Sequence, residues 1–198
     1  SFNINRMANS ANNKKLKVSV VGCGGRGTGA AVQALRADEN VELVAMADAF
    51  KDRLEKSLNA IKQEFEGEKK IKVKEKNMLV GFNGYKKAID LADVVILATP
   101  PGFRPLHFKY AIDQDKHVFM EKPVATDAHG VRQVLETAKV ANQKKLNVVV
   151  GLQRRYQYSY LNILKQVRRG VIGKITSGQV RWNGCLLYTS PSPRDGIG

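Results

Sequence analysis

The chain has 198 residues, of which 43% are hydrophobic, and it carries a formal net charge of +15. A chain of this length forms one domain, or one domain and part of a second, and no stretch is apolar and long enough to span a membrane. Its two cysteines are too few for a disulfide framework.

The positive charge raises the question of a nucleic-acid partner. The basic residues, however, are spread over predicted helix faces and the loop at 69–76. A single-strand binder would instead interleave them with aromatic side chains. We interpret the charge as a lysine-rich solvated surface and expect no nucleic-acid partner, with a basic nucleic-acid binder as the weaker alternative.

The N-terminal segment, 1–16, is polar at its start and predicted to be flexible. It does not resemble a signal peptide. We expect a cytoplasmic protein without a membrane partner, although the chain opens on Ser1 rather than Met, which leaves an export signal upstream open.

A strand, a glycine turn and the start of a helix are predicted at 17–27, KVSVVGCGGRG. Gly22, Gly24 and Gly27 have the G-x-G-x-x-G spacing. The first glycine allows the tight turn, the second lets the backbone approach a pyrophosphate, and the third lets the helix pack against the strand. The helix N-terminus then directs N–H groups and a partial positive charge at the phosphates.

The surrounding segments strengthen this interpretation over that of a merely structural glycine turn. A helix is predicted at 28–36, and a second strand at 41–47 ends at Asp48. Asp48 follows Gly27 by 21 positions, against the roughly 20 expected for the acid that binds the adenosine ribose. A carboxylate there would repel a 2′-phosphate, so we expect NAD rather than NADP. Cys23, inside the turn, is interpreted as a packing residue rather than a nucleophile.

Further elements follow in alternation. They are, in chain order, a helix at 51–65, a charged loop at 66–77, an apolar piece at 78–82, a helix at 85–91, a buried strand at 93–98, helices at 104–114 and 128–144 on either side of a strand at 117–120, and a strand at 147–150. Thr126 and Asp127 are good helix N-caps. This order predicts an α/β fold with a doubly wound parallel (Rossmann) sheet over 17–150, covered on both faces.

Two of these helices have predicted apolar faces. In the helix at 104–114 the face comprises Leu106, Tyr110 and Ala111. In the helix at 128–144 it comprises Val131, Val134, Leu135, Ala138 and Ala141. The Thr-Pro-Pro-Gly loop at 99–102 follows a buried strand and is expected at the carboxyl edge of the sheet, where ligands bind. His107 is expected near the same edge.

The character of the sequence changes after residue 150. A helix at 160–169 with Gly170 as its C-cap and a strand at 175–182 are predicted to begin a second, truncated α/β domain over 151–184. The segment 185–198 resembles the in-frame translation of a transposon-end sequencing adapter, with a natural Ser/Pro linker as the alternative. We expect the natural protein to continue beyond residue 184.

The order VVGCGGRG, Asp48, ATPP at 98–101 and KHVFMEKP at 116–123 resembles the Gfo/Idh/MocA oxidoreductases over residues 17–184. The resemblance implies a Rossmann domain followed by a substrate and oligomerisation domain, and a homo-oligomeric enzyme. It implies hydride transfer between NAD and a hydroxyl of a small sugar-like or cyclitol substrate. An NAD-dependent glycoside hydrolase and a non-catalytic NAD-binding regulator are the alternatives.

The resemblance also implies roles for individual residues. The expected cofactor-binding residues are Gly22, Cys23, Gly24, Gly25, Arg26, Gly27, Asp48, Thr99, Pro100, His107, Glu121 and Lys122. Lys122 is the expected catalytic lysine, because oxidation of an alcohol releases a proton that a nearby group must take or stabilise. Arg154, Arg155 and Tyr156 are expected to enter the substrate cleft. No metal site is expected. The family's second catalytic segment has no counterpart in this sequence, so we expect the chain to bind cofactor without turning over substrate by itself.

Overall fold

The computed structural model describes residues 15–66 and 69–179. The chain divides into two compact units, Ser1–Leu152 and Gln153–Gly198, close to the boundary expected at residue 150. The roles expected for the two parts stay predictions. The expected adapter segment at 185–198, and residues 1–14 of the N-terminal segment, lie outside the described residues. In the part of the chain that is described, no helix combines the length and apolar character needed to cross a membrane.

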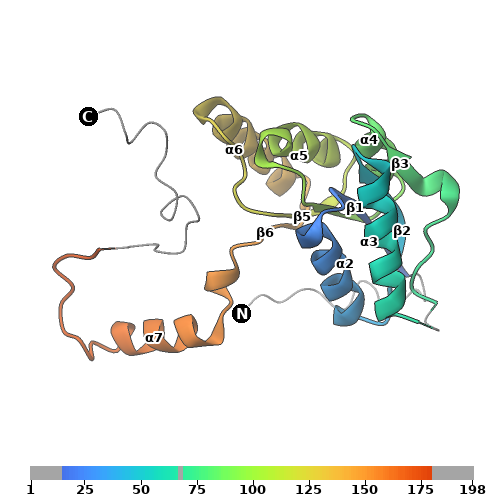
Figure 1. The fold of residues 1–198 in the computed structure, drawn as a ribbon. Helices are drawn as coiled ribbons and strands as arrows, with labels where there is room; N and C mark the ends of the chain where they lie inside the picture. The colour runs from blue at the N-terminus through green and yellow to red at the C-terminus, as the bar shows by residue number, and fades with distance from the viewer. Residues whose placement is uncertain (1–14, 67–68, 180–198) are drawn as a thin grey trace, which may run out of the picture. The chain divides into compact units, whose positions relative to one another are not determined.

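The first unit contains a parallel six-stranded sheet with the order β3-β2-β1-β4-β5-β6. Its strands are β1 (Leu16–Val21), β2 (Val41–Asp48), β3 (Met78–Val80), β4 (Val94–Leu97), β5 (His117–Met120) and β6 (Val148–Val150). The helices between them are α2 (Gly25–Ala37), α3 (Lys51–Glu64), α4 (Gly84–Asp90), α5 (Arg104–Asp113) and α6 (Ala128–Gln143), with short 3-10 turns η1 (Glu75–Asn77) and η2 (Pro101–Phe103). The predicted doubly wound fold is confirmed (Figure 1).

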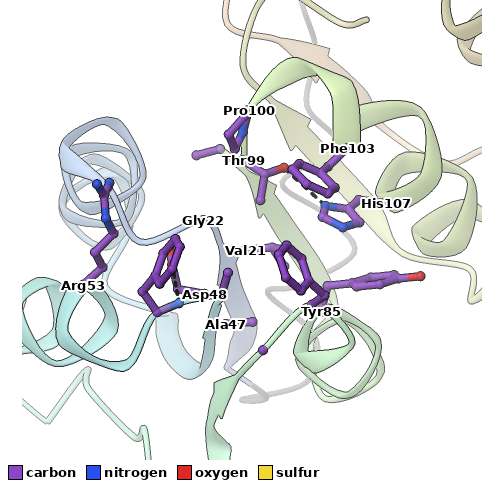
Figure 2. Close-up of a pocket in the computed structure, with 16 residues that line it drawn as sticks. Val21, Gly22, Ala47, Asp48, Arg53, Tyr85, Thr99, Pro100, Phe103 and His107 are labelled. Atoms are coloured by element: carbon purple, nitrogen blue, oxygen red, sulfur yellow. Dashed lines mark hydrogen bonds between the residues drawn. The ribbon is translucent and has the colours of Figure 1, made fainter.

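Strand β1 is the switch point of the sheet. It pairs with β2 on one side and β4 on the other, so Val21 faces both Ala47 and Leu97. The chain winds outwards in opposite directions from this strand. In open α/β sheets, ligands bind beyond the carboxyl ends of the strands at such a reversal. The glycine turn leaves β1 at this point (Figure 2).

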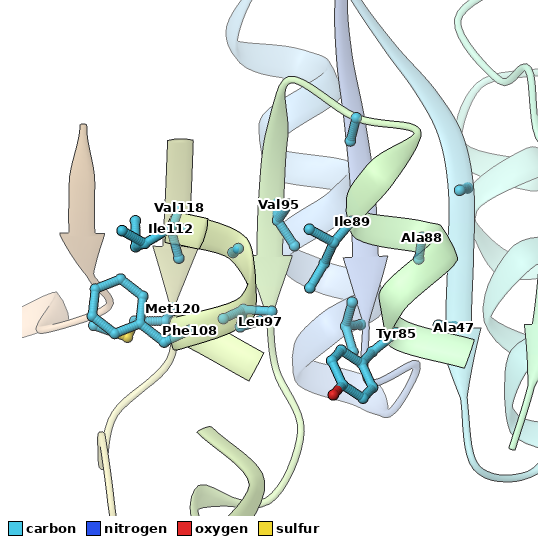
Figure 3. Close-up of a cluster of buried hydrophobic side chains, with 14 of the residues drawn as sticks. Ala47, Tyr85, Ala88, Ile89, Val95, Leu97, Phe108, Ile112, Val118 and Met120 are labelled. Atoms are coloured by element: carbon cyan, nitrogen blue, oxygen red, sulfur yellow. The ribbon is translucent and has the colours of Figure 1, made fainter. Parts of the chain in front are cut away.

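Two hydrophobic clusters hold the helices to the sheet, one on each face. Leu35, Leu54 and Ile61 of α2 and α3 pack with residues of β1 and β2 on one face. On the other face, α4, α5 and α6 pack against the sheet through residues such as Ile89 and Phe108 (Figure 3). Burial on both faces explains why the strands are continuously apolar rather than alternating.

The predicted buried faces of α5 and α6 are partly wrong. Leu106, Val131 and Leu135 are 52%, 40% and 58% exposed. The buried face of α5 instead includes Arg104 and His107. A prediction based on apolar residues leaves out such polar positions. It therefore assigned the wrong side of α5 to the core.

The second unit differs from its prediction in one element. Its described part holds a 3-10 turn η3 (Gln153–Arg155) and the helix α7 (Tyr158–Arg168). Gly170 has φ +79° and its N–H donates to the Val167 carbonyl at 3.0 Å, which ends the helix as predicted. Residues 175–179 form no strand, because a strand needs a neighbour to bond its backbone and none pairs with them in the described residues; the remainder of that predicted strand lies outside them.

Candidate functional site

The glycine turn is built from close backbone contacts. Gly22 has φ +97°, and a Cβ atom there would lie 2.5 Å from the Thr99 nitrogen. A Cβ at Gly27 would lie 1.9 Å from the Gly22 carbonyl oxygen. A Cβ at Gly24 would instead meet no heavy atom within 4 Å. Gly22 and Gly27 are therefore required by the fold, whereas Gly24 is an open surface at the N-terminus of α2, which a phosphate could approach.

Asp48 is fixed beside this turn by two backbone donors. The Cys23 N–H donates to its Oδ2 at 2.7 Å, and the Phe50 N–H donates to its Oδ1 at 3.0 Å. Each carboxylate oxygen can accept more than one hydrogen bond. The carboxylate is thus oriented and still able to accept bonds from ligand hydroxyls.

Cys23 packs into the core below the turn. Only 3% of it is exposed, and its Sγ lies 3.4 Å from the Ala47 carbonyl oxygen, to which it donates. Burial, and secondarily the charge of Asp48, raises the pKa of the thiol to about 12. The thiol is therefore protonated near neutral pH and unsuited to act as a nucleophile.

A cavity of about 400 Å³ opens between the glycine turn and the loops that follow β2, β3 and β4. Six of the predicted cofactor residues line it, namely Gly22, Gly24, Asp48, Thr99, Pro100 and His107. The other six are not among its lining residues, namely Cys23, Gly25, Arg26, Gly27, Glu121 and Lys122. The cavity also has lining residues that the sequence reasoning missed, among them Phe50, Arg53, Phe82, Tyr85 and Phe103.

Aromatic rings form one wall of this cavity (Figure 2). The Tyr85 and His107 ring centroids are 4.2 Å apart, and the His107 and Phe103 centroids 6.0 Å. His107 is buried and its Nδ1 lies 3.2 Å from the Thr99 Oγ1. Burial, together with the charge of Arg104, lowers the pKa of His107 to about 4. The imidazole is neutral at physiological pH and serves as a fixed hydrogen-bonding ring.

Glu121 ties the exit of β5 to the glycine turn. Its Oε1 lies 2.7 Å from the Arg26 Nε, and its side chain is 10% exposed. A Cβ at Gly151 would lie 2.7 Å from the same Oε1, so the glycine makes room for the carboxylate. Sequence reasoning assigned Arg26 and Glu121 to different parts of a ligand, but the structure brings them together.

Arg104 was missed entirely. Only 1% of it is exposed, and its guanidinium donates to the backbone carbonyls of Thr99 and Glu121. Burial lowers its pKa, while the charge of Glu121 opposes that change. The signal available in the sequence was its place two residues after the Thr-Pro-Pro-Gly loop and directly before Pro105.

Lys122 and the predicted substrate residues are less constrained. Lys122 is exposed, directly follows Glu121 and precedes Pro123 through a cis peptide bond. Arg154 donates to the Gln157 Oε1 at 2.7 Å and lies over the Tyr160 ring within the second unit. Arg154, Arg155 and Tyr156 belong to the second unit, and their substrate role stays a prediction. Across residues 15–66 and 69–179, no three His, Cys, Asp or Glu side chains are grouped to hold a metal ion.

Comparisons with known proteins identify the family and the fold. The model of an oxidoreductase family with an NAD-binding Rossmann fold, GFO_IDH_MocA, matches residues 16–152. Inositol 2-dehydrogenase 4 of Saccharopolyspora erythraea is 30% identical over 82% of the chain and 44% of its own length. A glycosyl hydrolase family 109 protein of Solibacter usitatus is 25% identical over 86% of the chain and 38% of its own length.

A solved structure has the same fold. Myo-inositol 2-dehydrogenase from Lactobacillus plantarum superimposes with a TM-score of 0.65 at 28% identity, over 82% of the chain and 43% of that protein. The chain therefore spans about two fifths of the length of the relatives it matches.

Proposed function

The chain belongs to the Gfo/Idh/MocA family of oxidoreductases with an NAD-binding Rossmann fold, and from this premise we propose that it binds NAD in the cavity at the switch point. We further propose that the protein moves a hydride between NAD and a hydroxyl of a cyclitol or sugar-like polyol. Two of the named relatives are inositol dehydrogenases, which supports this substrate class. Because the chain spans about two fifths of their length, we assign the complete reaction to a protein that also has a substrate domain.

The observation that carries the proposal is the position of Asp48. Its carboxylate lies at the end of β2, lines the cavity and is held by the Cys23 and Phe50 amides. From there it can accept hydrogen bonds from the two hydroxyls of an adenosine ribose, and its charge disfavours a 2′-phosphate. NAD is thus favoured over NADP, although Arg53 in the same cavity is a cation that a 2′-phosphate could use.

The remaining cofactor contacts follow from the open surface at the glycine turn. Gly24, Gly25 and the first amides of α2 would hold the pyrophosphate. Thr99, Pro100 and His107 would line the cofactor further along the cavity, and Glu121 would contact the nicotinamide ribose. When bound, the nicotinamide accepts or donates the hydride.

We assign the transfer of the proton to Lys122. Oxidation of a hydroxyl releases a proton as the hydride leaves, and an amine placed at the end of β5 can accept or stabilise it. Lys122 is exposed at this strand exit, directly after the Glu121 carboxylate that anchors the loop. Its role is to hold and move that proton at the substrate oxygen.

A hydrolase is the second candidate, because one relative is a glycosyl hydrolase family 109 protein. In such a reaction, transient oxidation by bound NAD would be reversed before product release. Net NADH accumulation with a polyol, followed at 340 nm in the full-length protein, supports the dehydrogenase. Glycoside cleavage without net NADH supports the hydrolase.

The first test is an equilibrium titration of the 198-residue chain with NAD and NADP. We expect saturable NAD binding that is tighter than NADP binding, and a loss of about tenfold or more in NAD affinity for Asp48→Ala. Asp52→Ala, an exposed acid in the first turn of α3, is the matched control and should leave the affinity unchanged. Tighter NADP binding, or no effect of Asp48→Ala, would contradict the role of Asp48.

A further inference from the structure

Arg104 joins the exits of two neighbouring strands. It is the first residue of α5 and is 1% exposed. Its Nη1 donates to the Glu121 carbonyl oxygen, and its Nη2 donates to the Thr99 carbonyl oxygen. Glu121 directly follows β5, and Thr99 lies just beyond the end of β4. One guanidinium therefore bonds to both loops at the carboxyl edge of the sheet.

Packing alone does not account for this residue. Burial of a guanidinium costs desolvation energy that an apolar side chain of similar volume would avoid. The Arg104 Nε is buried and has no hydrogen-bond partner within the described chain. The opposing charge of Glu121 offsets part of the cost. What an apolar side chain could not supply is the pair of donors that hold the two carbonyls.

The held peptide groups belong to the proposed site. The Thr99 carbonyl lies in the peptide bond to Pro100, and both residues line the cavity. The Glu121 carbonyl lies in the peptide bond to Lys122. Arg104 thus binds the carbonyl that precedes Lys122 and the carbonyl of the cavity-lining Thr99. It is not itself among the cavity-lining residues.

We propose that Arg104 is a positioning residue for hydride transfer. Its planar guanidinium fixes the Thr99–Pro100 and Glu121–Lys122 peptide bonds relative to each other, and so places the Lys122 amine relative to a cofactor lying along Thr99 and Pro100. The inference rests on the proposed function. A lysine cannot replace the arginine, because an ammonium is a point donor and does not span two fixed carbonyls as a planar fork does.

The first experiment measures amide hydrogen exchange in the 198-residue chain. Three amides report on the two loops, because Ala98, Phe103 and Glu121 donate to the carbonyls of Val21, Pro100 and Leu97. We expect Arg104→Lys to speed their exchange by about tenfold or more while β2 and α3 stay protected. The control is Ile112→Val on the same helix, a core residue away from the cavity (Figure 3). In Ile112→Val, the exchange of these three amides should not be accelerated more than that of other amides.

The second experiment separates positioning from stability in the full-length protein. With myo-inositol as the probe, Arg104→Lys should lower kcat by about 10²-fold, the scale of a 1 Å misplacement, with KM for the polyol and Kd for NAD changed by less than about threefold. Ile112→Val should keep kcat near that of the wild type. Arg104→Gln, which keeps a single NH2 group and removes the charge, serves as a second variant where Arg104→Lys fails to fold.

The outcomes separate the two proposals. A kcat of Arg104→Lys no lower than that of Ile112→Val, or unchanged exchange at the three amides, overturns the role of Arg104. If the wild-type protein transfers no hydride from the polyol, the proposed function fails. The exchange of Ala98, Phe103 and Glu121 still decides whether Arg104 fixes the two loops.

Discussion

Arg26 and Glu121 form an ion pair across the carboxyl edge of the sheet, with 2.7 Å between Nε and Oε1. Arg26 lies in the first turn of α2, and Glu121 follows β5, a strand two places from β1 in the sheet. The Glu121 carboxylate also offsets the buried charge of Arg104. One carboxylate thus connects the glycine turn, the β5 exit and the start of α5.

Glu121→Gln should therefore destabilise the fold. The Arg26 side chain is 48% exposed, so the ion pair itself contributes little. The larger effect comes from leaving the charge of Arg104 without its buried counter-charge, and we expect a loss of about 2 kcal/mol in the free energy of unfolding. Urea unfolding followed by circular dichroism measures it. Glu64→Gln, which breaks the exposed pair with Arg36, is the control and should cost less than about 0.5 kcal/mol; equal losses in the two variants would contradict this account.

Two glycines in one turn should respond differently to alanine. At Gly22 a Cβ would meet the Thr99 nitrogen at 2.5 Å, and φ is +97°, so Gly22→Ala should cost about 2 kcal/mol or more in unfolding free energy. At Gly24 a Cβ meets no atom, so Gly24→Ala should keep the stability within about 0.5 kcal/mol. The added methyl should instead weaken NAD binding by about tenfold or more, because it occupies the surface that the pyrophosphate approaches.

Thermal unfolding and an NAD titration on the same samples test the pair. A stable Gly24→Ala protein with unchanged NAD affinity would place the pyrophosphate elsewhere. A fully stable Gly22→Ala protein would mean that the turn can rearrange without cost.

Burial of His107 should make the stability depend on pH. Its pKa is lowered to about 4 in the folded protein, from about 6.5 in an unfolded chain. Below pH 6.5 the unfolded state binds this proton first, so the free energy of unfolding falls as the pH drops from 6.5 towards 4. The stability that the neutral His107 contributes at pH 7 is completely lost only when the pH falls below its folded-state pKa of about 4.

His107→Asn removes the titrating group. Between pH 7 and pH 5, the wild type should lose about 1 to 2 kcal/mol more stability than this variant, measured by urea unfolding at each pH. His129→Asn, at an exposed position on α6, should retain the pH dependence of the wild type. The same pH dependence in the wild type and in His107→Asn would show that His107 is not buried in its neutral form.

Local sequence patterns predicted the sheet and part of the site. The continuous β-branched run in β4 identifies a strand buried on both faces, and it needs no knowledge of distant residues. The spacing of Gly22, Gly24 and Gly27 lies within one strand–turn–helix segment, which fixes its geometry by itself. Asp48 is identified as the candidate ribose-binding acid by its distance along the chain from that turn. In the structure, Asp48 ends β2, and the three glycines lie in the turn after β1 and the first turn of α2.

The parts that were missed depend on contacts between distant segments. The sequence alone favours a surface position for Arg104, because a charged side chain is rarely buried without a partner. Its partners are backbone carbonyls on other loops, which one sequence does not reveal. The contact of Tyr85 with His107 joins α4 to α5, and the ion pair of Arg26 with Glu121 spans 95 positions of the chain. Such pairings appear only once the strand order is known.

Lys122 provides the most direct test of chemistry. In the full-length protein, Lys122→Ala should lower kcat by about 10²-fold or more, the scale of a lost acid–base group, while NAD affinity changes by less than about threefold. The reason is that the amine acts on the proton of the reacting hydroxyl, whereas the pyrophosphate and ribose contacts lie at the glycine turn and Asp48. Lys109→Ala on α5, which removes an exposed pair with Asp113, is the control and should leave kcat unchanged. Unchanged turnover in Lys122→Ala would refute the assignment. Equal losses of turnover and of NAD affinity would make Lys122 a cofactor-binding residue rather than the group that takes the proton.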